Sequence, residues 1–134
     1  MKKQQFGAGI WHFATYVDRY NTDGYGEPRS VLDAIELAGK VKDLSVVDIN
    51  FPYFGGNFTN EEIKASLEKV NLNVIGITPE IYTKEFRKGA FTNPDPGIRN
   101  RAHELITEAC DAVRFFNASY VKLWPGQDGW DYPF

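Results

Sequence analysis

The chain has 134 residues, of which 43% are hydrophobic and 15% aromatic, enough for one packed domain. Its net charge is -3 and its pI about 5.4, without the clustered Lys and Arg that binding to a nucleic-acid backbone needs. No apolar run approaches the roughly 20 residues of a membrane span. We therefore expect neither a nucleic acid nor a membrane as partner.

Strand-like and helix-like segments alternate along the chain. Residues 6–13 are apolar and predict a first strand, with glycines that indicate close packing or a bend. Ser30, followed by Asp33, predicts a helix start, and Leu32, Ile35, Ala38 and Val41 follow at helical spacing. Residues 44–50 are rich in β-branched side chains and predict a second strand.

The same alternation continues in the second part of the chain. Thr59 and Glu62 form a predicted capping box, before the helical stripe Ile63, Leu67 and Val70. A third strand is predicted over residues 72–78. Asp95-Pro96 predicts the start of a third helix, because Pro favours the first helical position. Residues 119–124 predict a fourth strand.

Strand-helix units of this length predict parallel strands with right-handed crossovers. The predicted fold class is α/β, a parallel β/α barrel of TIM type present as roughly a half barrel. It would have four strands and three helices on the outer face. An open doubly wound sheet would want a Gly-rich phosphate turn after the first strand, where this chain has Trp11, His12 and Phe13. Aromatics at strand exits suit a sugar ring better than a phosphate. Half a barrel exposes its first and fourth strands, which favours a homo-oligomer.

Candidate site residues lie where the strands end, since barrel enzymes build their sites there. Trp124 stands directly before Pro125 at the exit of the fourth strand, and is a candidate substrate contact. Lys122 lies two residues earlier and should share its face. Asp48 and Asn50 also share one face, and Asp48 is predicted to pair with Lys122, functionally or as a buried structural ion pair.

Two further candidates follow other strands. His12 is either a hydrogen-bond partner of the substrate or a structural imidazole. Glu80 is either a sugar or metal contact or a cap of its loop. The single cysteine, Cys110, permits no internal disulfide, and residues 6–13 lack the cleavage site of a signal peptide. These features favour a cytoplasmic location.

Four segments resemble xylose isomerases in the same order along the chain. They are Gly9-Ile-Trp11, Asp23-Gly-Tyr-Gly26, the run 89–103 that opens with Gly-Ala-Phe-Thr, and the run 120–129 that contains Trp-Pro-Gly-Gln-Asp-Gly. The chain, over residues 1–134, therefore resembles the amino-terminal half of a xylose isomerase-like TIM-barrel domain. That superfamily also includes sugar epimerases.

The resemblance implies roles for several residues. Trp124 would be the ring against which the sugar lies, and Trp11 would help to shape the pocket floor. Tyr25 would reach the site of a neighbouring subunit. Asn50 stands where the family has a His, and Gln127-Asp128 replaces an Arg-Glu pair. The resemblance therefore does not select xylose as the substrate over another aldose, ketose or deoxy-sugar.

The implied function is the amino-terminal part of a metal-dependent sugar isomerase that interconverts an aldose and a ketose. Mg or Mn would serve the complete protein, in which later strands carry the metal ligands and the catalytic Lys. We expect this chain alone to bind no metal and to turn over no sugar. Two alternatives stay open: a sugar 3-epimerase of the same superfamily, and a non-catalytic half-barrel for binding or assembly.

Overall fold

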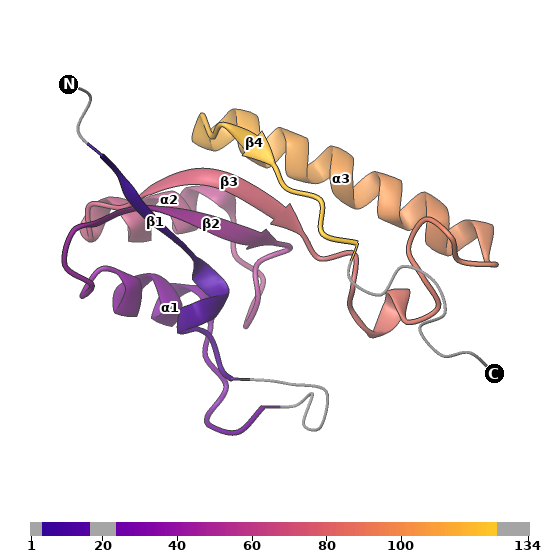
Figure 1. Ribbon diagram of the computed structural model, residues 1–134, viewed down its shortest axis with the longest axis horizontal. Helices are drawn as coiled ribbons and strands as arrows, with labels where there is room; N and C mark the ends of the chain where they lie inside the picture. Colours follow the sequence, from indigo (N-terminus) through magenta and orange to yellow (C-terminus); the bar gives the residue numbers. More distant parts are fainter. Residues whose placement is uncertain (1–3, 17–23, 126–134) are drawn as a thin grey trace.

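The sheet and the helices form two layers. In the computed structural model, which describes residues 4–16 and 24–125, four parallel strands form one sheet in the order β1-β2-β3-β4 (Figure 1). The described strands are β1 (Phe6–Gly9), β2 (Leu44–Phe51), β3 (Asn73–Pro79) and β4 (Tyr120–Val121). The described helices are α1 (Val31–Ala38), α2 (Asn60–Lys69) and α3 (Pro96–Phe116), with 3-10 turns η1 (Ile10–Phe13) and η2 (Lys84–Phe86). The sheet does not close, and β1 and β4 are its edges. This confirms the predicted half barrel.

The helices begin where the sequence predicts. The Ser30 hydroxyl accepts a hydrogen bond from the Asp33 N–H, and the Asp33 carboxylate accepts one from the Ser30 N–H. Thr59 and Glu62 form the same reciprocal pair at the start of α2. Such caps satisfy N–H groups that a helix leaves unpaired in its first turn. Pro96 opens α3. No helix in the described part of the chain is both long and apolar enough to cross a bilayer.

The main core lies between the sheet and the helices. Val47, Ile49 and Ile77 are fully buried on the helix side of the sheet. They pack with buried side chains from all three helices: Val31, Ala34, Ile35, Ala38, Ile63, Leu67, Ala109 and Ala112. A second cluster anchors the segment between β3 and α3, and consists of Ile81, Phe86, Ala90, Ala102 and Leu105. Burying a side chain of the size of Ile contributes roughly 1.5–3 kcal/mol.

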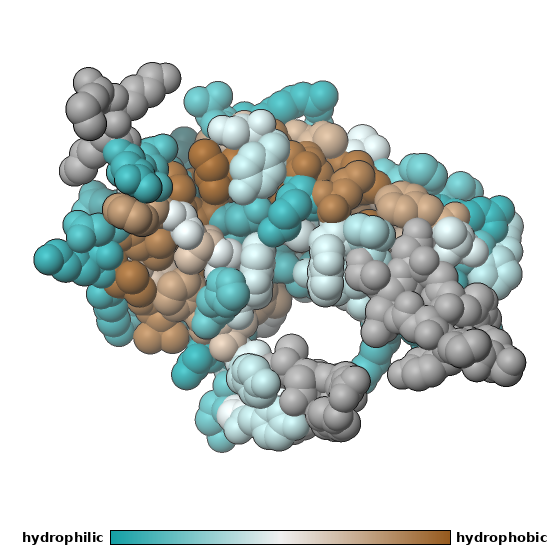
Figure 2. All heavy atoms as spheres, viewed as in Figure 1, coloured by the Kyte–Doolittle hydropathy of each residue, from teal (hydrophilic) through white to brown (hydrophobic). Residues whose placement is uncertain are grey.

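The other face of the sheet carries no helix among the described residues, and mixes polar groups with hydrophobic ones (Figure 2). Gly9, Asp48, Gly76 and Tyr120 lie in register across all four strands. A Cβ at Gly9 would overlap the ring of Trp11, and one at Gly76 would overlap the ring of Tyr120. The two glycines therefore let these rings lie against the sheet on either side of Asp48.

The prediction of one strand over residues 6–13 is wrong in its second half. The strand ends at Gly9 and the chain turns into η1 (Ile10–Phe13). Ile10 is completely buried, and η1 packs closely on α1. Turning at Gly9 places Ile10 in the core and returns the ring of Trp11 over the open face. An extended chain would instead have kept both residues in the sheet, beside Ile49 and Asn50 of β2.

The first helix is also shorter than its apolar stripe suggests. The helix ends at Ala38, with Gly39 as C-cap, so Val41 lies beyond it and is 45% exposed. The Gly39 N–H still bonds to the Ile35 carbonyl. A Cβ at Gly39 would overlap the side chain of Val70, so a glycine at this position lets the ends of α1 and α2 approach closely.

The fourth strand is shorter than residues 119–124, the predicted range. It comprises Tyr120–Val121, and both Leu123 and Trp124 are exposed. The residues that flank it, Ser119 and Lys122, donate backbone hydrogen bonds to the carbonyls of Ile75 and Ile77 in β3.

Proline explains where this ladder ends. Alternate strand residues direct their backbone groups to the same side, so Pro79 is the next β3 residue turned toward β4. It has no N–H to donate, and the ladder cannot extend past it. The segment that carries Trp124 is therefore released from the sheet.

Candidate functional site

A buried carboxylate organises the polar part of the helix-free face. Asp48, at the centre of β2, is 5% exposed. Its Oδ1 accepts a 2.6 Å hydrogen bond from the Thr78 hydroxyl, and its Oδ2 accepts one of 3.1 Å from the Tyr120 hydroxyl. Partial burial, together with the carboxylate beside Tyr120, raises the pKa of that phenol. Buried charges need such partners, because an unpaired one is costly.

Lys122 completes this cluster. Its Nζ lies 3.4 Å from Asp48 Oδ2 and 4.1 Å from the centroid of the Trp11 ring. The predicted pair of Asp48 with Lys122 is thus confirmed. The ammonium group sits between a carboxylate and an aromatic face, both of which attract a cation. Lys122 therefore links Trp11 to the end of β4 across the open face.

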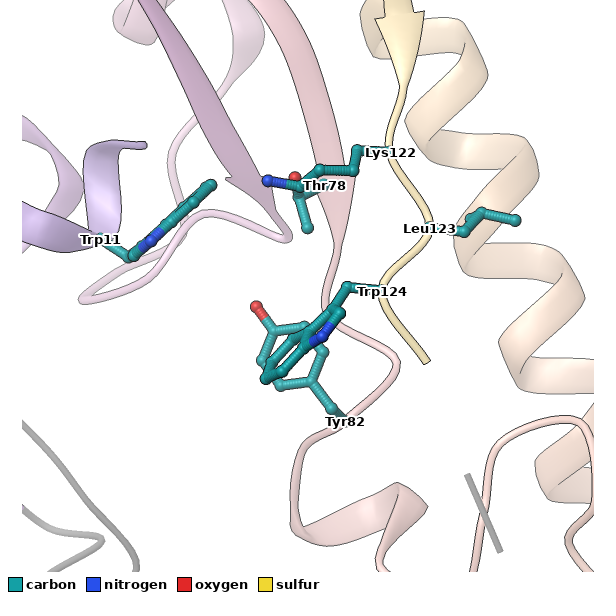
Figure 3. Close-up of a pocket in the computed structure, with 6 residues that line it drawn as sticks. All are labelled: Trp11, Thr78, Tyr82, Lys122, Leu123 and Trp124. Atoms are coloured by element: carbon teal, nitrogen blue, oxygen red, sulfur yellow. The ribbon is translucent and has the colours of Figure 1, made fainter. Parts of the chain in front are cut away.

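A cavity of about 470 Å³ opens at the carboxyl ends of the strands. Its lining comes from the ends of β1, β3 and β4: Trp11, Thr78, Tyr82, Lys122, Leu123 and Trp124. Figure 3 shows Lys122 reaching toward Trp11, and the rings of Tyr82 and Trp124 side by side across the opening. The Leu123 side chain points away, toward α3 (Figure 3). The volume suits a small ligand, and aromatic rings make up much of the wall.

Tyr82 connects this aromatic wall to the sheet. Its ring meets that of Trp124 edge to face, with centroids 5.0 Å apart. Its hydroxyl accepts a 2.8 Å hydrogen bond from Nδ2 of Asn50. Burial raises the pKa of Tyr82 to about 12, with a further contribution from the Glu80 carboxylate. The phenol therefore keeps its proton at neutral pH.

Glu80 follows β3 directly and is half-buried. Its N–H donates to the carbonyl of Phe51, which ties the exit of β3 to that of β2. Burial raises the pKa of its carboxyl group to about 7. A carboxyl group with this pKa can act as a donor or an acceptor near neutral pH.

The structure brings together three of the predicted site residues and separates others. Trp11, Lys122 and Trp124 line the cavity, while Asn50 lies behind it and touches Tyr82. His12 is exposed, with its ring 5.7 Å from that of Trp11, and does not line the cavity. Five residues of the resembling segments lie outside the described residues: Asp23 and residues 126–129.

Tyr25, the predicted subunit contact, stands apart from the cavity. Its side chain is 57% exposed, and its ring packs 5.5 Å from that of Tyr16. It does not belong to the cavity lining that the described residues form.

Sequence reasoning missed Thr78 and Tyr82. Thr78 ends the predicted third strand and pairs in register with Asn50, so strand alternation would have indicated it. Tyr82 follows Ile81, which is fully buried. An amphipathic aromatic residue directly after a core residue was the sequence feature that could have indicated Tyr82.

The described residues do not fit a metal centre. Among residues 4–16 and 24–125, no group of three His, Cys, Asp or Glu side chains is placed to hold an ion. The most buried carboxylate, Asp48, is already engaged by two hydroxyls and an ammonium group. We therefore derive no metal-dependent step from this part of the chain.

Fold and site together define a parallel β/α half barrel with an aromatic cavity at the carboxyl ends of its strands. The chain is similar to the xylose isomerase of Thermus thermophilus, with 25% identity over 139 aligned residues, 95% of this chain and 35% of that protein. It is also similar to the xylose isomerase of a Chelativorans species, with 29% identity over 70 residues, 52% of this chain and 16% of that protein. The chain matches no protein-family model. It spans about a third of the length of the Thermus relative, and the similarities support a relation to the sugar isomerase-like superfamily.

Proposed function

We propose that this chain supplies the sugar-binding, amino-terminal half of a sugar isomerase that interconverts an aldose and a ketose. The cavity carries the proposal: three aromatic residues, Trp11, Tyr82 and Trp124, surround a space that also has a hydroxyl and an ammonium group. Sugars have apolar C–H faces and polar rims, and such walls complement both. The similarity to two xylose isomerases supports the same class of ligand.

The charges favour a neutral sugar. Lys122 already has Asp48 and the Trp11 ring as partners, so an anionic ligand would compete with a carboxylate that is 5% exposed. Trp124 is 58% exposed, which leaves its ring free to take a C–H face of the ligand. Asn50, which is hydrogen-bonded to Tyr82, and Glu80, which acts electrostatically on the same phenol, are further polar groups of the proposed site.

The proposed role of this chain is to hold and orient the sugar. In the complete protein, Mg or Mn would stabilise charge on a sugar oxygen. A homo-oligomer in which Tyr25 approaches a neighbouring subunit, and a cytoplasmic location, belong to the same proposal.

Binding of neutral pentoses and hexoses to the chain tests this function. We expect D-xylose or another neutral monosaccharide to shift the NMR signals of residues around the cavity. Trp124→Ala should weaken that binding about tenfold, since an aromatic contact contributes roughly 1 kcal/mol beyond its buried area. Phe115→Ala is the matched control, because Phe115 is an exposed aromatic residue on α3 that packs edge to face on another ring and does not line the cavity. If no monosaccharide binds, or if both variants bind as the parent does, the cavity is not a sugar site.

A further inference from the structure

We propose that Tyr82 is a specificity-determining residue: its hydroxyl, held in place by Asn50, donates a hydrogen bond to an oxygen atom of the ligand. The inference rests on the proposed function only in taking that ligand to be a sugar. Neither the sequence patterns nor the resemblance to isomerases assigns a role to this hydroxyl. Because of this hydrogen bond, the cavity would prefer a ligand that places an oxygen atom beside the Tyr82 hydroxyl over a similar ligand that lacks this oxygen.

The first observation is the direction of the bond between Asn50 and Tyr82. Asn50 Nδ2 donates to the Tyr82 hydroxyl oxygen at 2.8 Å. An amide N–H occupies one acceptor position of the phenol, and the phenol's own proton remains for another partner. Because Tyr82 lines the cavity, that partner can be a ligand atom. The raised pKa of Tyr82, about 12, keeps the proton in place.

The second observation is that folding does not account for Asn50. The side chain is 3% exposed, yet its Oδ1 has no hydrogen-bond partner among the described residues. The present orientation leaves Oδ1 and one N–H of Nδ2 unpaired, whereas turning the amide over would leave both N–H donors unpaired. A buried amide selected for stability would have both ends satisfied. The side-chain hydrogen bond that Asn50 does make is the one that positions Tyr82, so we assign it as a positioning residue.

The third observation is that Tyr82 is restrained by its buried neighbour in the chain and by a second ring. Ile81 is buried in the cluster beneath the loop, and the ring meets Trp124 edge to face at 5.0 Å. The hydroxyl therefore keeps its place beside the ring proposed to take the sugar's C–H face. A ligand without an oxygen there would leave a desolvated donor unpaired, and sites of this kind reject such ligands strongly.

Phenol and toluene test the inference without relying on a sugar. They have nearly the same shape, but only phenol carries an oxygen to accept from Tyr82. We expect the chain to bind phenol at least tenfold more tightly than toluene in NMR titrations of the cavity residues, because a buried donor left unpaired costs about 1–3 kcal/mol. In Tyr82→Phe this preference should fall to about threefold or less, with toluene affinity unchanged.

Tyr53→Phe is the control substitution, because the Tyr53 hydroxyl bonds to Asn60 away from the cavity. It should keep the parent's preference. The proposal is overturned if the parent chain shows no preference for phenol, or if Tyr82→Phe retains it. It is also overturned if toluene affinity falls in parallel, since Tyr82 would then only shape the wall. If the parent chain prefers phenol to toluene but binds no monosaccharide, the proposed function is refuted and this inference stands.

Discussion

The Nζ of Lys122 lies 3.4 Å from Oδ2 of Asp48, across the helix-free face of the sheet. Asp48 belongs to the centre of β2, and Lys122 directly follows β4, so the pair spans the sheet from its middle to one edge. Asp48 is almost completely buried, whereas the Lys122 side chain is 40% exposed. The carboxylate is therefore the member of the pair whose loss the fold should feel more.

Asp48→Ala should lower the free energy of unfolding by about 2–4 kcal/mol. The substitution leaves the buried Thr78 hydroxyl without its acceptor, at a desolvation cost, and it also removes the shared carboxylate from the partly exposed Tyr120 hydroxyl and Lys122 ammonium group. Urea denaturation measures the effect. Glu36→Ala, which removes the carboxylate of an exposed pair with Lys40, should change stability by less than about 0.5 kcal/mol. Equal effects of the two substitutions would show that the Asp48 cluster is not a stabilising unit.

Gly76→Ala should lower stability by about 1–3 kcal/mol, because the new Cβ would overlap the ring of Tyr120. The cost should nearly vanish in a Tyr120→Ala background, where the ring is absent. Gly26→Ala is the control, since a Cβ there meets no atom within 4 Å. Melting temperatures of the single and double variants measure the coupling. If Gly76→Ala costs the same with and without Tyr120, the ring does not lie against the sheet as described.

Glu80 should make stability depend on pH. Its pKa in the folded chain, about 7, lies above the value of 4.5 for a free carboxyl group, so the folded state binds the proton more tightly. The free energy of unfolding should therefore fall as pH rises from about 4.5 to about 7, and then level off. The Gln side chain of Glu80→Gln does not titrate in this range. The free energy of unfolding of this variant should therefore fall by about 1–3 kcal/mol less than that of the parent.

Urea denaturation at pH 5 and pH 8 measures this difference. Glu85→Gln, at an exposed position of the same loop, should keep the parent's pH dependence. The quantity to compare is the free energy of unfolding of the parent chain minus that of Glu80→Gln. If this difference stays the same or rises between pH 5 and pH 8, Glu80 is not held in a desolvating site.

The sequence by itself determined where the helices start and how the strands pair. Ser30 with Asp33, and Thr59 with Glu62, form reciprocal caps within four residues of chain, so their chemistry does not depend on the rest of the fold. The alternation of short strands with helices predicted that the strands pair in parallel. Strand alternation, together with the expected parallel sheet, also predicted that Asp48 pairs with Lys122.

Only the tertiary structure decided where the first and fourth strands end and which side chains share the cavity. The fourth strand stops because Pro79, on a neighbouring strand, has no N–H to offer it. The first strand stops at Gly9 because Ile10 finds a buried place on α1.

Tyr82 faces the cavity because Ile81 is buried in a cluster that α3 completes. These outcomes depend on contacts between residues far apart in the chain, whereas propensity and spacing describe only near neighbours. Local patterns therefore predicted the layers of this protein, and packing between distant segments built its site.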